Sequence, residues 1–345
     1  MNGPAETQAF QLFSSELRDV LDMELRRLLD ARAGWAGGLG DDVAVMVGAV
    51  RSLALRGGKR LRAALIGAAL EGFGVSWRDA VPALAAIELL QTYFLIHDDW
   101  MDEDEVRRGG PSVHAMLRDD FGSRRAGEVS AILAGDFAAA LATDSLASTQ
   151  VPAPRVVEAL RLFARMQCEV IAGQLLDVRA SGVVETMHDL KTGSYTVRGP
   201  LAIGAALAGA SPESRAALDA LSRPLGVAFQ LRDDLLGTFG DPKTTGKPVG
   251  GDLRQGKRTA IVAALDGDPI AAPLLARVHG RKDASHDDVA ALLAHMDRSG
   301  ARARVESRLT ALLDEAREIL GRIELAPHGA ELLAGAIAAL GVRET

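Results

Sequence analysis

Hydrophobic positions along this chain recur at helical rather than strand spacing. Apolar side chains lie three or four positions apart from Phe10 to Leu28, and the same spacing returns from Val81 to Phe94. This spacing gathers apolar side chains on one face of a helix. Alternating stretches typical of strands are scarce, and alanine and leucine, which favour helices, are abundant. The pattern therefore predicts an all-α fold.

Glycine and proline mark the ends of the predicted helices. The helices expected from the periodicity cover residues 5–32, 42–56, 59–73, 78–102, 123–146, 155–180, 185–197, 200–209, 213–237, 257–266, 285–297, 301–322 and 328–341. The polar, glycine-rich segment from Gly240 to Thr259 is predicted to be a functional loop, because long loops inside compact domains often carry function. Since no proline- or serine-rich linker divides the chain, we expect a single domain over residues 1–345.

The amino-acid composition argues against several classes of function. The chain is 48% hydrophobic, enough for a sizeable core, and its formal net charge of −7 argues against nucleic acid as a partner. Cys168 is the only cysteine, which excludes an intrachain disulfide and a cysteine metal cluster and fits a reducing compartment. No signal-like amino terminus occurs, and no apolar run reaches the roughly 18 residues of a membrane span. We therefore expect a cytoplasmic protein.

Three carboxylates lie at the end of the predicted helix 78–102. Asp98 and Asp102 are four positions apart and share a face, whereas Asp99 lies about 100° around the helix. Like charges at this spacing repel, so a bound cation is a natural partner, and oxygen ligands of this kind suit Mg²⁺. An acidic run is more often a solvated surface, and that alternative stays open for this cluster taken alone.

A second acidic pair strengthens the metal hypothesis. Asp233 and Asp234 end another apolar helix, and Gln230 lies one turn before Asp233. Two such helix ends, if they face each other, would clamp several metal ions. A calcium loop of the EF-hand type is excluded, because the segment after Asp98 lacks the alternating ligands and the glycine at the sixth position.

Basic residues accompany the acidic clusters in three places. They are Lys59, Arg60 and Arg62 in GGKRLR, Arg107 and Arg108 in RRGG, and Lys247, Lys257 and Arg258 in the glycine-rich loop. Guanidinium and ammonium groups bind phosphate oxygens, and GGKRLR leads into a helix whose amino terminus favours anions. Each group alone is as consistent with ordinary surface charge. Neither GxxxxGK[ST] nor a GxGxxG after a strand occurs, so no standard nucleotide site is supported.

Taken in order, the motifs resemble those of the trans-isoprenyl diphosphate synthases, or polyprenyl synthetases, of the short-chain (farnesyl and geranylgeranyl) type. The matching segments are GGKRLR (57–62), ELLQTYFLIHDDWMD (88–102), RRGGPSVH (107–114), KTGSYT (191–196), FQLRDDLLGTFGDP (229–242), TGKP (245–248) and GKRT (256–259). The resemblance implies an all-α bundle around a deep apolar cavity, usually a homodimer. It also implies a reaction that joins isopentenyl diphosphate head to tail to a C5, C10 or C15 allylic diphosphate.

The resemblance also implies a role for each matching residue. Mg²⁺, about three ions per active site with substrate bound, would be held by Asp98, Asp102 and Asp233, supported by Asp99 and Asp234. The allylic diphosphate would be held by Arg107, Lys191 and Lys247, with Lys257 nearby. Isopentenyl diphosphate would be held by Lys59, Arg62, Gln91 and Arg108. The allylic carbocation would be stabilised by the amide of Gln230, the hydroxyl of Thr192 and helix carbonyls near Lys191.

Two positions depart from the family pattern. Gly237 stands where the second acidic motif usually has its third aspartate, so a direct metal role at that position is in doubt. Gln91 stands where many bacterial members have histidine, and its amide can still donate to phosphate.

Tyr93 and Phe94 precede the first acidic motif, where the family places the floor of the chain-elongation cavity. Two bulky rings there predict a short product, C15 or C20, although aromatic residues in an apolar helix are by default core residues. His97 and His114 are interpreted as hydrogen-bonded structural residues.

Two other functions share parts of this pattern. A class I terpene cyclase has an acidic helix end and Mg²⁺-driven ionisation but needs one diphosphate site, so the additional cations Lys59, Arg62 and Arg108 disfavour it. A non-catalytic subunit of a heteromeric synthase could lose its metal ligands, whereas both acidic motifs are present here.

Overall fold

The structure is a computed structural model that describes residues 3–179, 181, 186–187, 189–241 and 249–341. Over these residues the all-α prediction is confirmed, because the only strands are β1 (Val106–Arg107) and β2 (Gly110–Pro111), an antiparallel hairpin. The helical elements are α1 (Gly3–Gly37), α2 (Asp41–Leu55), α3 (Leu61–Gly72), η1 (Trp77–Ala80), α4 (Val81–Met101), α5 (Val113–Phe121), α6 (Arg124–Ala147), α7 (Ala153–Val178), η2 (Asp189–Arg198), α9 (Gly199–Ala208), α10 (Pro212–Phe239), α12 (Gly251–Arg254), α13 (Ala260–Ala263), α14 (Ala271–Val278), α15 (His286–Arg298), α16 (Ala301–Leu320) and α17 (Pro327–Gly341).

The chain divides into two compact units. Unit 1 comprises residues 1–168, 195–216 and 324–335, and unit 2 comprises residues 169–194, 217–323 and 336–345. Because these segments alternate along the sequence, no single linker separates the units. The expectation of one domain stays a prediction.

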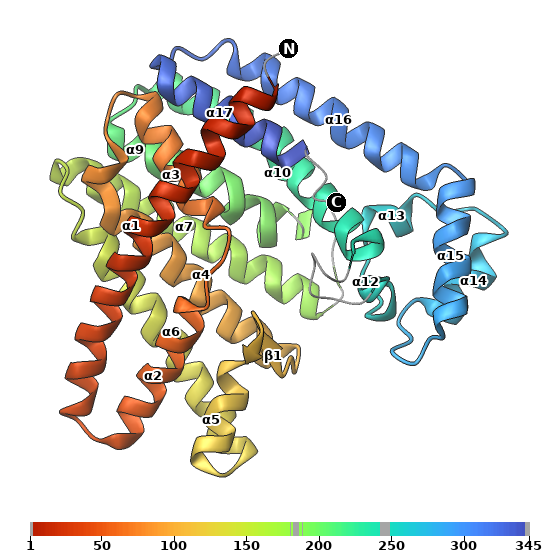
Figure 1. Cartoon of the computed structure of the whole chain (residues 1–345), viewed down its shortest axis with the longest axis horizontal. Helices are drawn as coiled ribbons and strands as arrows, with labels where there is room; N and C mark the ends of the chain where they lie inside the picture. The colour runs from red at the N-terminus through yellow and green to blue at the C-terminus, as the bar shows by residue number, and fades with distance from the viewer. Residues whose placement is uncertain (1–2, 180, 182–185, 188, 242–248, 342–345) are drawn as a thin grey trace. The chain divides into compact units, whose positions relative to one another are not determined.

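Helix α4 is the core helix of unit 1. Every side chain from Ala83 to Tyr93 is buried, which is the pattern of a helix surrounded by others rather than one with a solvent face. It packs most extensively against α6 and also against α3 and α1, while α1 and α2 form an antiparallel pair (Figure 1). Because the body of α4 is packed on all sides, the position of its acidic carboxyl end is fixed.

Helices α4 and α6 are also long and apolar enough to cross a membrane by length and composition. The apolar window of the segment Trp77–Met101, which includes α4, is 72% buried inside the protein, and that of α6 is 44% buried. The burial of α4 identifies it as a core helix, and the expected absence of a membrane span stays a prediction.

Unit 2 contains the carboxyl-terminal part of α10 and the shorter helices that follow it. Helix α15 packs on α14 and α16, and α13 packs on α16. The guanidinium of Arg302 on α16 lies 4.4 Å above the ring of Phe239, and Arg232 Nη1 donates to the carbonyl oxygen of Ala339 at 2.8 Å. These contacts hold the end of α10, where the second acidic pair lies.

The predicted helix 257–266 is wrong in length. Thr259 is the N-cap, its hydroxyl accepts from the Val262 N–H, and the helix covers only Ala260–Ala263. Helices α5 and α14 were not predicted at all, because elements this short show few turns of periodicity and depend on packing. The predicted loop from Gly240 contains the short helix α12. The predicted helix 185–197 lies partly outside the described residues, and from Asp189 onward this segment is the π-helix η2.

Candidate active site

The first acidic cluster stands at the carboxyl end of α4, where its three carboxylates differ in exposure. Asp98 is half-buried, Asp102 is exposed, and Asp99 is completely buried. Burial raises the pKa of Asp99 to about 6, although Arg107 opposes the shift. Asp99 therefore faces the protein interior, whereas Asp98 and Asp102 are accessible to solvent, as their helical spacing predicted.

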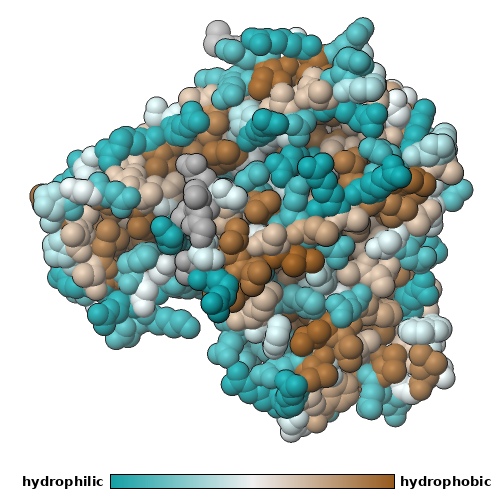
Figure 2. Space-filling view, turned by 180° about the vertical axis from the view of Figure 1, so that it is seen from behind, coloured by the Kyte–Doolittle hydropathy of each residue, from teal (hydrophilic) through white to brown (hydrophobic). Residues whose placement is uncertain are grey.

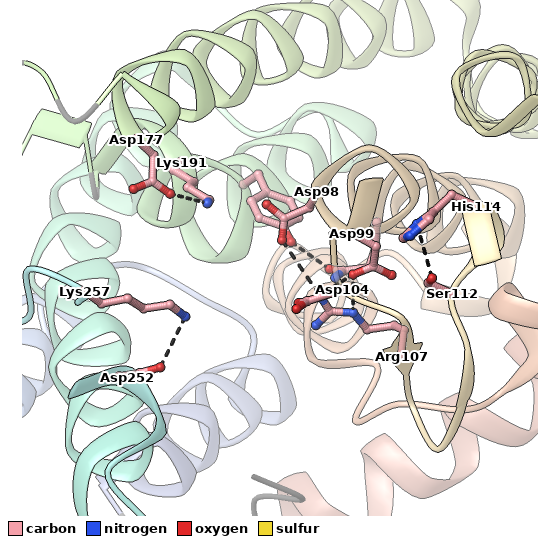
Figure 3. A network of polar contacts seen from close by, with 12 residues as sticks. Asp98, Asp99, Asp104, Arg107, Ser112, His114, Asp177, Lys191, Asp252 and Lys257 are labelled. Atoms are coloured by element: carbon pink, nitrogen blue, oxygen red, sulfur yellow. Dashed lines mark hydrogen bonds and ion pairs between the residues drawn. The ribbon is translucent and has the colours of Figure 1, made fainter. Parts of the chain in front are cut away.

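Arg107 on β1 is surrounded by these carboxylates (Figure 3). Its Nε donates to Asp99 Oδ1 at 2.6 Å, and its Nη2 lies 3.4 Å from Asp104 Oδ2 and 3.9 Å from Asp98 Oδ2. The hairpin brings the guanidinium here by pairing Arg107 with Gly110. Arg107 thus supplies a positive charge to the acidic cluster.

The basic motif GGKRLR separates into side chains with different surroundings. Arg60 is 3% exposed and forms a buried ion pair with Glu88, Nη1 to Oε2 2.9 Å, and another with Asp22. Lys59 is exposed and Arg62 half-buried. Arg60, which the resemblance did not assign to a substrate, is thus paired with two carboxylates of the protein.

Arg62 and Gln91 meet at Tyr195, a residue to which the sequence assigned no role. The Tyr195 hydroxyl donates to Gln91 Oε1 at 2.9 Å, and the Arg62 guanidinium lies 4.0 Å above the Tyr195 ring. Arg62 Nη2 also donates to the hydroxyl of Thr196 at 2.9 Å. Because Gln91 accepts through its oxygen, its amide N–H groups remain available as donors. The signal for Tyr195 was its place within KTGSYT.

Arg108 lies beside this group and has an unsatisfied side chain. Its Nη1 is buried without a hydrogen-bond partner, and so is the Nε of Arg62. Burial lowers the pKa of Arg108, as do the nearby cations Arg60 and Arg62. Buried guanidinium nitrogens are costly unless paired, so these two nitrogens are candidates for hydrogen bonds to an anion.

Tyr93 and Phe94 lie on α4 before the acidic cluster, with ring centroids 4.8 Å apart. The Phe94 ring also makes an edge contact with Tyr195 at 5.2 Å. The structural interpretation of His97 and His114 is confirmed: His97 Nε2 lies 3.1 Å from the carbonyl oxygen of Ile132, and His114 Nδ1 lies 3.2 Å from Ser112 Oγ (Figure 3).

In unit 2, η2 presents Lys191 and Thr192, both half-buried. Lys191 Nζ pairs with Asp177 Oδ2 at 2.5 Å, and Asp177 lies at the end of α7 (Figure 3). Sequence analysis did not identify this acidic partner. Lys247, expected beside Lys191, lies outside the described residues.

The second acidic pair stands near the end of α10. Asp233 is exposed, whereas Asp234 is buried and accepts hydrogen bonds from Gln230 Nε2 and from the Ala260 N–H, both at 2.7 Å. Burial raises the pKa of Asp234 to about 6, against these two hydrogen bonds. Because the amide nitrogen of Gln230 donates to Asp234, its amide oxygen is the atom that can face a positive charge.

Gly237 faces Asp252, a carboxylate from α12 that sequence analysis did not identify. A β-carbon at position 237 would lie 2.6 Å from Asp252 Cγ, so the carboxylate occupies that space. Asp252 is 7% exposed, and its Oδ1 lies 3.2 Å from Lys257 Nζ (Figure 3). The end of α10 thus keeps a carboxylate despite the missing aspartate.

Among the described residues, no three histidine, cysteine, aspartate or glutamate side chains converge closely enough to hold a metal ion by themselves. The donor chemistry still fits Mg²⁺. This ion takes one or two carboxylate oxygens and completes its coordination with phosphate oxygens and water, so it needs no cage made wholly of protein. Asp98 and Asp102 offer such oxygens from one helix end.

Comparisons with known proteins agree on one family. The family model described as Polyprenyl synthetase matches residues 43–296. A geranylfarnesyl diphosphate synthase of Aeropyrum pernix is 34% identical, covering 80% of this chain and 87% of the relative. A (2E,6E)-farnesyl diphosphate synthase of Mycobacterium tuberculosis is 34% identical, covering 87% and 82%.

A solved structure shows the same likeness in three dimensions. The geranylgeranyl pyrophosphate synthase of Corynebacterium glutamicum, complexed with isoprenyl diphosphate and magnesium, superposes with a TM-score of 0.84 at 33% identity. The match covers 95% of this chain and 98% of that one.

Proposed function

Because the chain belongs to the polyprenyl synthetase family and is a prenyltransferase, we propose that it condenses isopentenyl diphosphate with C5, C10 or C15 allylic diphosphates to give a C15 or C20 product, with Mg²⁺ as cofactor. The observation that carries the proposal is the contrast between two arginines that are adjacent in sequence. Arg107 lies among carboxylates, whereas Arg108 and Arg62 have buried guanidinium nitrogens without partners. Two anions held in different ways account for this contrast.

The two substrates must be treated differently, because only the allylic diphosphate should ionise. Asp98, Asp102 and Asp233, supported by Asp99 and Asp234, would hold about three Mg²⁺ ions. When bound, Mg²⁺ neutralises the allylic diphosphate and makes it a better leaving group. Arg107, Lys191, Lys247 and Lys257 would orient that diphosphate.

The isopentenyl diphosphate would be held by protein cations alone, which leaves its C–O bond intact. Arg108 and Arg62 would gain the partners that their buried nitrogens lack, and Gln91 would donate through its amide. Lys59 would add a further charge. This arrangement holds the homoallylic double bond close to the allylic carbon, and proximity supplies much of the acceleration.

The bond changes balance without a side-chain base. The allylic C–O bond breaks, the homoallylic double bond attacks the allylic carbon, and a new carbon–carbon bond forms. The resulting cation loses a proton to the departed diphosphate. Gln230 Oε1, the Thr192 hydroxyl and helix carbonyls near Lys191 would stabilise the first cation by their negative dipoles.

Product length rests on Tyr93 and Phe94. Their contacting rings support a floor that stops the chain at C15 or C20. The related proteins include farnesyl, geranylgeranyl and geranylfarnesyl diphosphate synthases, so kinship alone leaves the length open.

The homodimer expected of this family is part of the proposal. Helix α6 exposes apolar side chains at helical spacing, with Val129 38% and Leu133 55% exposed, and Figure 2 shows hydrophobic side chains gathered in patches on one face of the molecule. Such surface on α6 suits a partner helix. Cytoplasmic location remains part of the proposal as well.

Product analysis tests the function directly. Purified protein is given labelled isopentenyl diphosphate and a C5, C10 or C15 primer, with and without Mg²⁺. We expect Mg²⁺-dependent C15 or C20 product and a loss of at least about a hundredfold in Asp102→Asn. The matched control is Glu103→Gln, the next carboxylate along the chain, which pairs with Arg124 and should stay near wild type. A cyclic terpene, or no condensation with any primer, would contradict the proposal.

A further inference from the structure

Arg56 holds the hairpin that carries Arg107 and Arg108. It is the residue after α2, and its Nη1 donates to the carbonyl oxygen of Pro111 at 2.6 Å and to that of Arg107 at 3.1 Å. Its Nη2 donates to Ser52 Oγ at 3.0 Å, which ties the guanidinium back to α2. One side chain thus connects α2 to both strands of the hairpin.

Gly110 makes this contact possible. A β-carbon at position 110 would lie 2.8 Å from both Cζ and Nη1 of Arg56, so the guanidinium lies directly against the backbone there. Any larger residue would force the guanidinium away from the two carbonyl oxygens. The second glycine of RRGG is therefore explained by a close approach to Arg56.

Arg108 lies between the two carbonyls that Arg56 binds. Its φ is +51° and that of Gly109 is +70°, as the two-residue turn between the paired residues Arg107 and Gly110 requires, and a residue with a β-carbon adopts this left-handed conformation only at a cost. Its guanidinium reaches Gly58, where a β-carbon would lie 3.4 Å from Arg108 Nη2. The clamp at 107 and 111 holds the backbone that aims this side chain.

We propose that Arg56 is a positioning residue for Arg108, holding it in the left-handed conformation that presents its guanidinium to the diphosphate of isopentenyl diphosphate. The identity of that anion rests on the proposed function. Arg107 depends less on the clamp, because Asp99 and Asp104 anchor its side chain. Loss of the clamp therefore affects one substrate and spares the other.

An arginine is required because the guanidinium binds three acceptors through two nitrogens, the two carbonyl oxygens through Nη1 and Ser52 Oγ through Nη2. Lysine would keep the charge, but its single compact ammonium cannot reach the carbonyl oxygens and Ser52 together. Arg56→Lys should therefore raise KM for isopentenyl diphosphate about tenfold, while KM for the allylic primer and kcat change less than about twofold. Gly110→Ala, which displaces the same guanidinium, should produce the same split.

The matched control is Arg51→Lys. Arg51 lies on α2 and pairs with Asp30 at the surface, Nε to Oδ1 2.7 Å. The Arg51→Lys substitution should leave the KM values for both substrates unchanged. A rescue experiment adds a second readout: millimolar guanidinium should partly restore KM for isopentenyl diphosphate in Arg56→Ala but not in Arg108→Ala.

Direct binding separates this proposal from the proposed function. The affinity of inorganic pyrophosphate in the absence of metal, measured by calorimetry, should fall about tenfold in Arg56→Lys even if no condensation were detected in wild type. Unchanged pyrophosphate affinity and unchanged KM for isopentenyl diphosphate, with a lowered melting temperature, would show a structural role only and overturn the proposal. An equal rise of both KM values in Arg56→Lys and Gly110→Ala would also overturn it.

Discussion

The carboxylate of Asp252 fills the space that a side chain at Gly237 would occupy, with Asp252 Cγ 2.6 Å from where a β-carbon would be. The family pattern has an aspartate at that position of the second acidic motif. Here the negative charge beside Asp234 comes from α12, and Lys257 contacts it from the same loop. The departure therefore relocates a carboxylate rather than removing it.

Gly237→Ala tests this relationship. The new methyl group must displace Asp252, and we expect the free energy of unfolding to fall by about 1–3 kcal/mol, the usual cost of overpacking. Adding Asp252→Gly should recover part of the loss, because the clash disappears and the two effects are then non-additive. Urea denaturation measures all three variants. Gly34→Ala is the control, since nothing lies within 4 Å of a β-carbon there.

Tyr195→Phe removes one hydrogen bond and keeps the ring. Gln91 Oε1 would be left buried without its donor, so we expect a loss of about 1–2 kcal/mol in unfolding free energy. KM for isopentenyl diphosphate should rise as the amide of Gln91 loses its fixed orientation. Tyr195→Leu also removes the ring under Arg62, so its unfolding free energy should be lower than that of Tyr195→Phe by about 1 kcal/mol. Equal stability of the two variants would argue against the cation–π contact.

Arg60 and Glu88 should behave as a buried structural pair. Arg60→Ala leaves Glu88, which is 4% exposed, without its partner, and we expect a cost of about 3–5 kcal/mol. Arg124→Ala breaks surface pairs with Glu103 and Glu128 and should cost less than about 1 kcal/mol. Thermal denaturation compares the two. A small effect at Arg60 would contradict its role as a buried structural pair with Glu88.

In the metal-free protein, the stability contributed by Asp99 and Asp234 should be lost as the pH rises from about 4 to about 6. The pKa values of Asp99 and Asp234 are about 6 in the folded state, above those of unfolded aspartate, so the folded state binds more protons in this window. The contribution of each group to the unfolding free energy then falls with rising pH, by up to about 1.4 kcal/mol per pH unit. Asp234→Asn should flatten the profile. Calorimetry between pH 4 and pH 8 in the presence of a chelator checks both statements.

Local pattern by itself determined the helical class, most helix positions and the order of the acidic and basic motifs. Apolar spacing within about ten residues specifies a helix, and the charges follow at its ends, so Asp98, Asp102 and Asp233 could be found without coordinates. The motifs in sequence order were also enough to place the chain in its family, as the comparisons confirm.

Tertiary structure decided which charges are buried and what each one contacts. Arg60 and Arg62 are two residues apart in one motif, yet one lies in a buried ion pair and the other stacks on Tyr195, distant in sequence. Asp252 and Arg56 likewise act through backbone approaches that only folding creates. Periodicity records which face of a helix is apolar, whereas desolvation and pairing depend on segments far apart in the chain. The order of the charged motifs is therefore a property of the sequence alone, whereas packing decides the partner of each side chain.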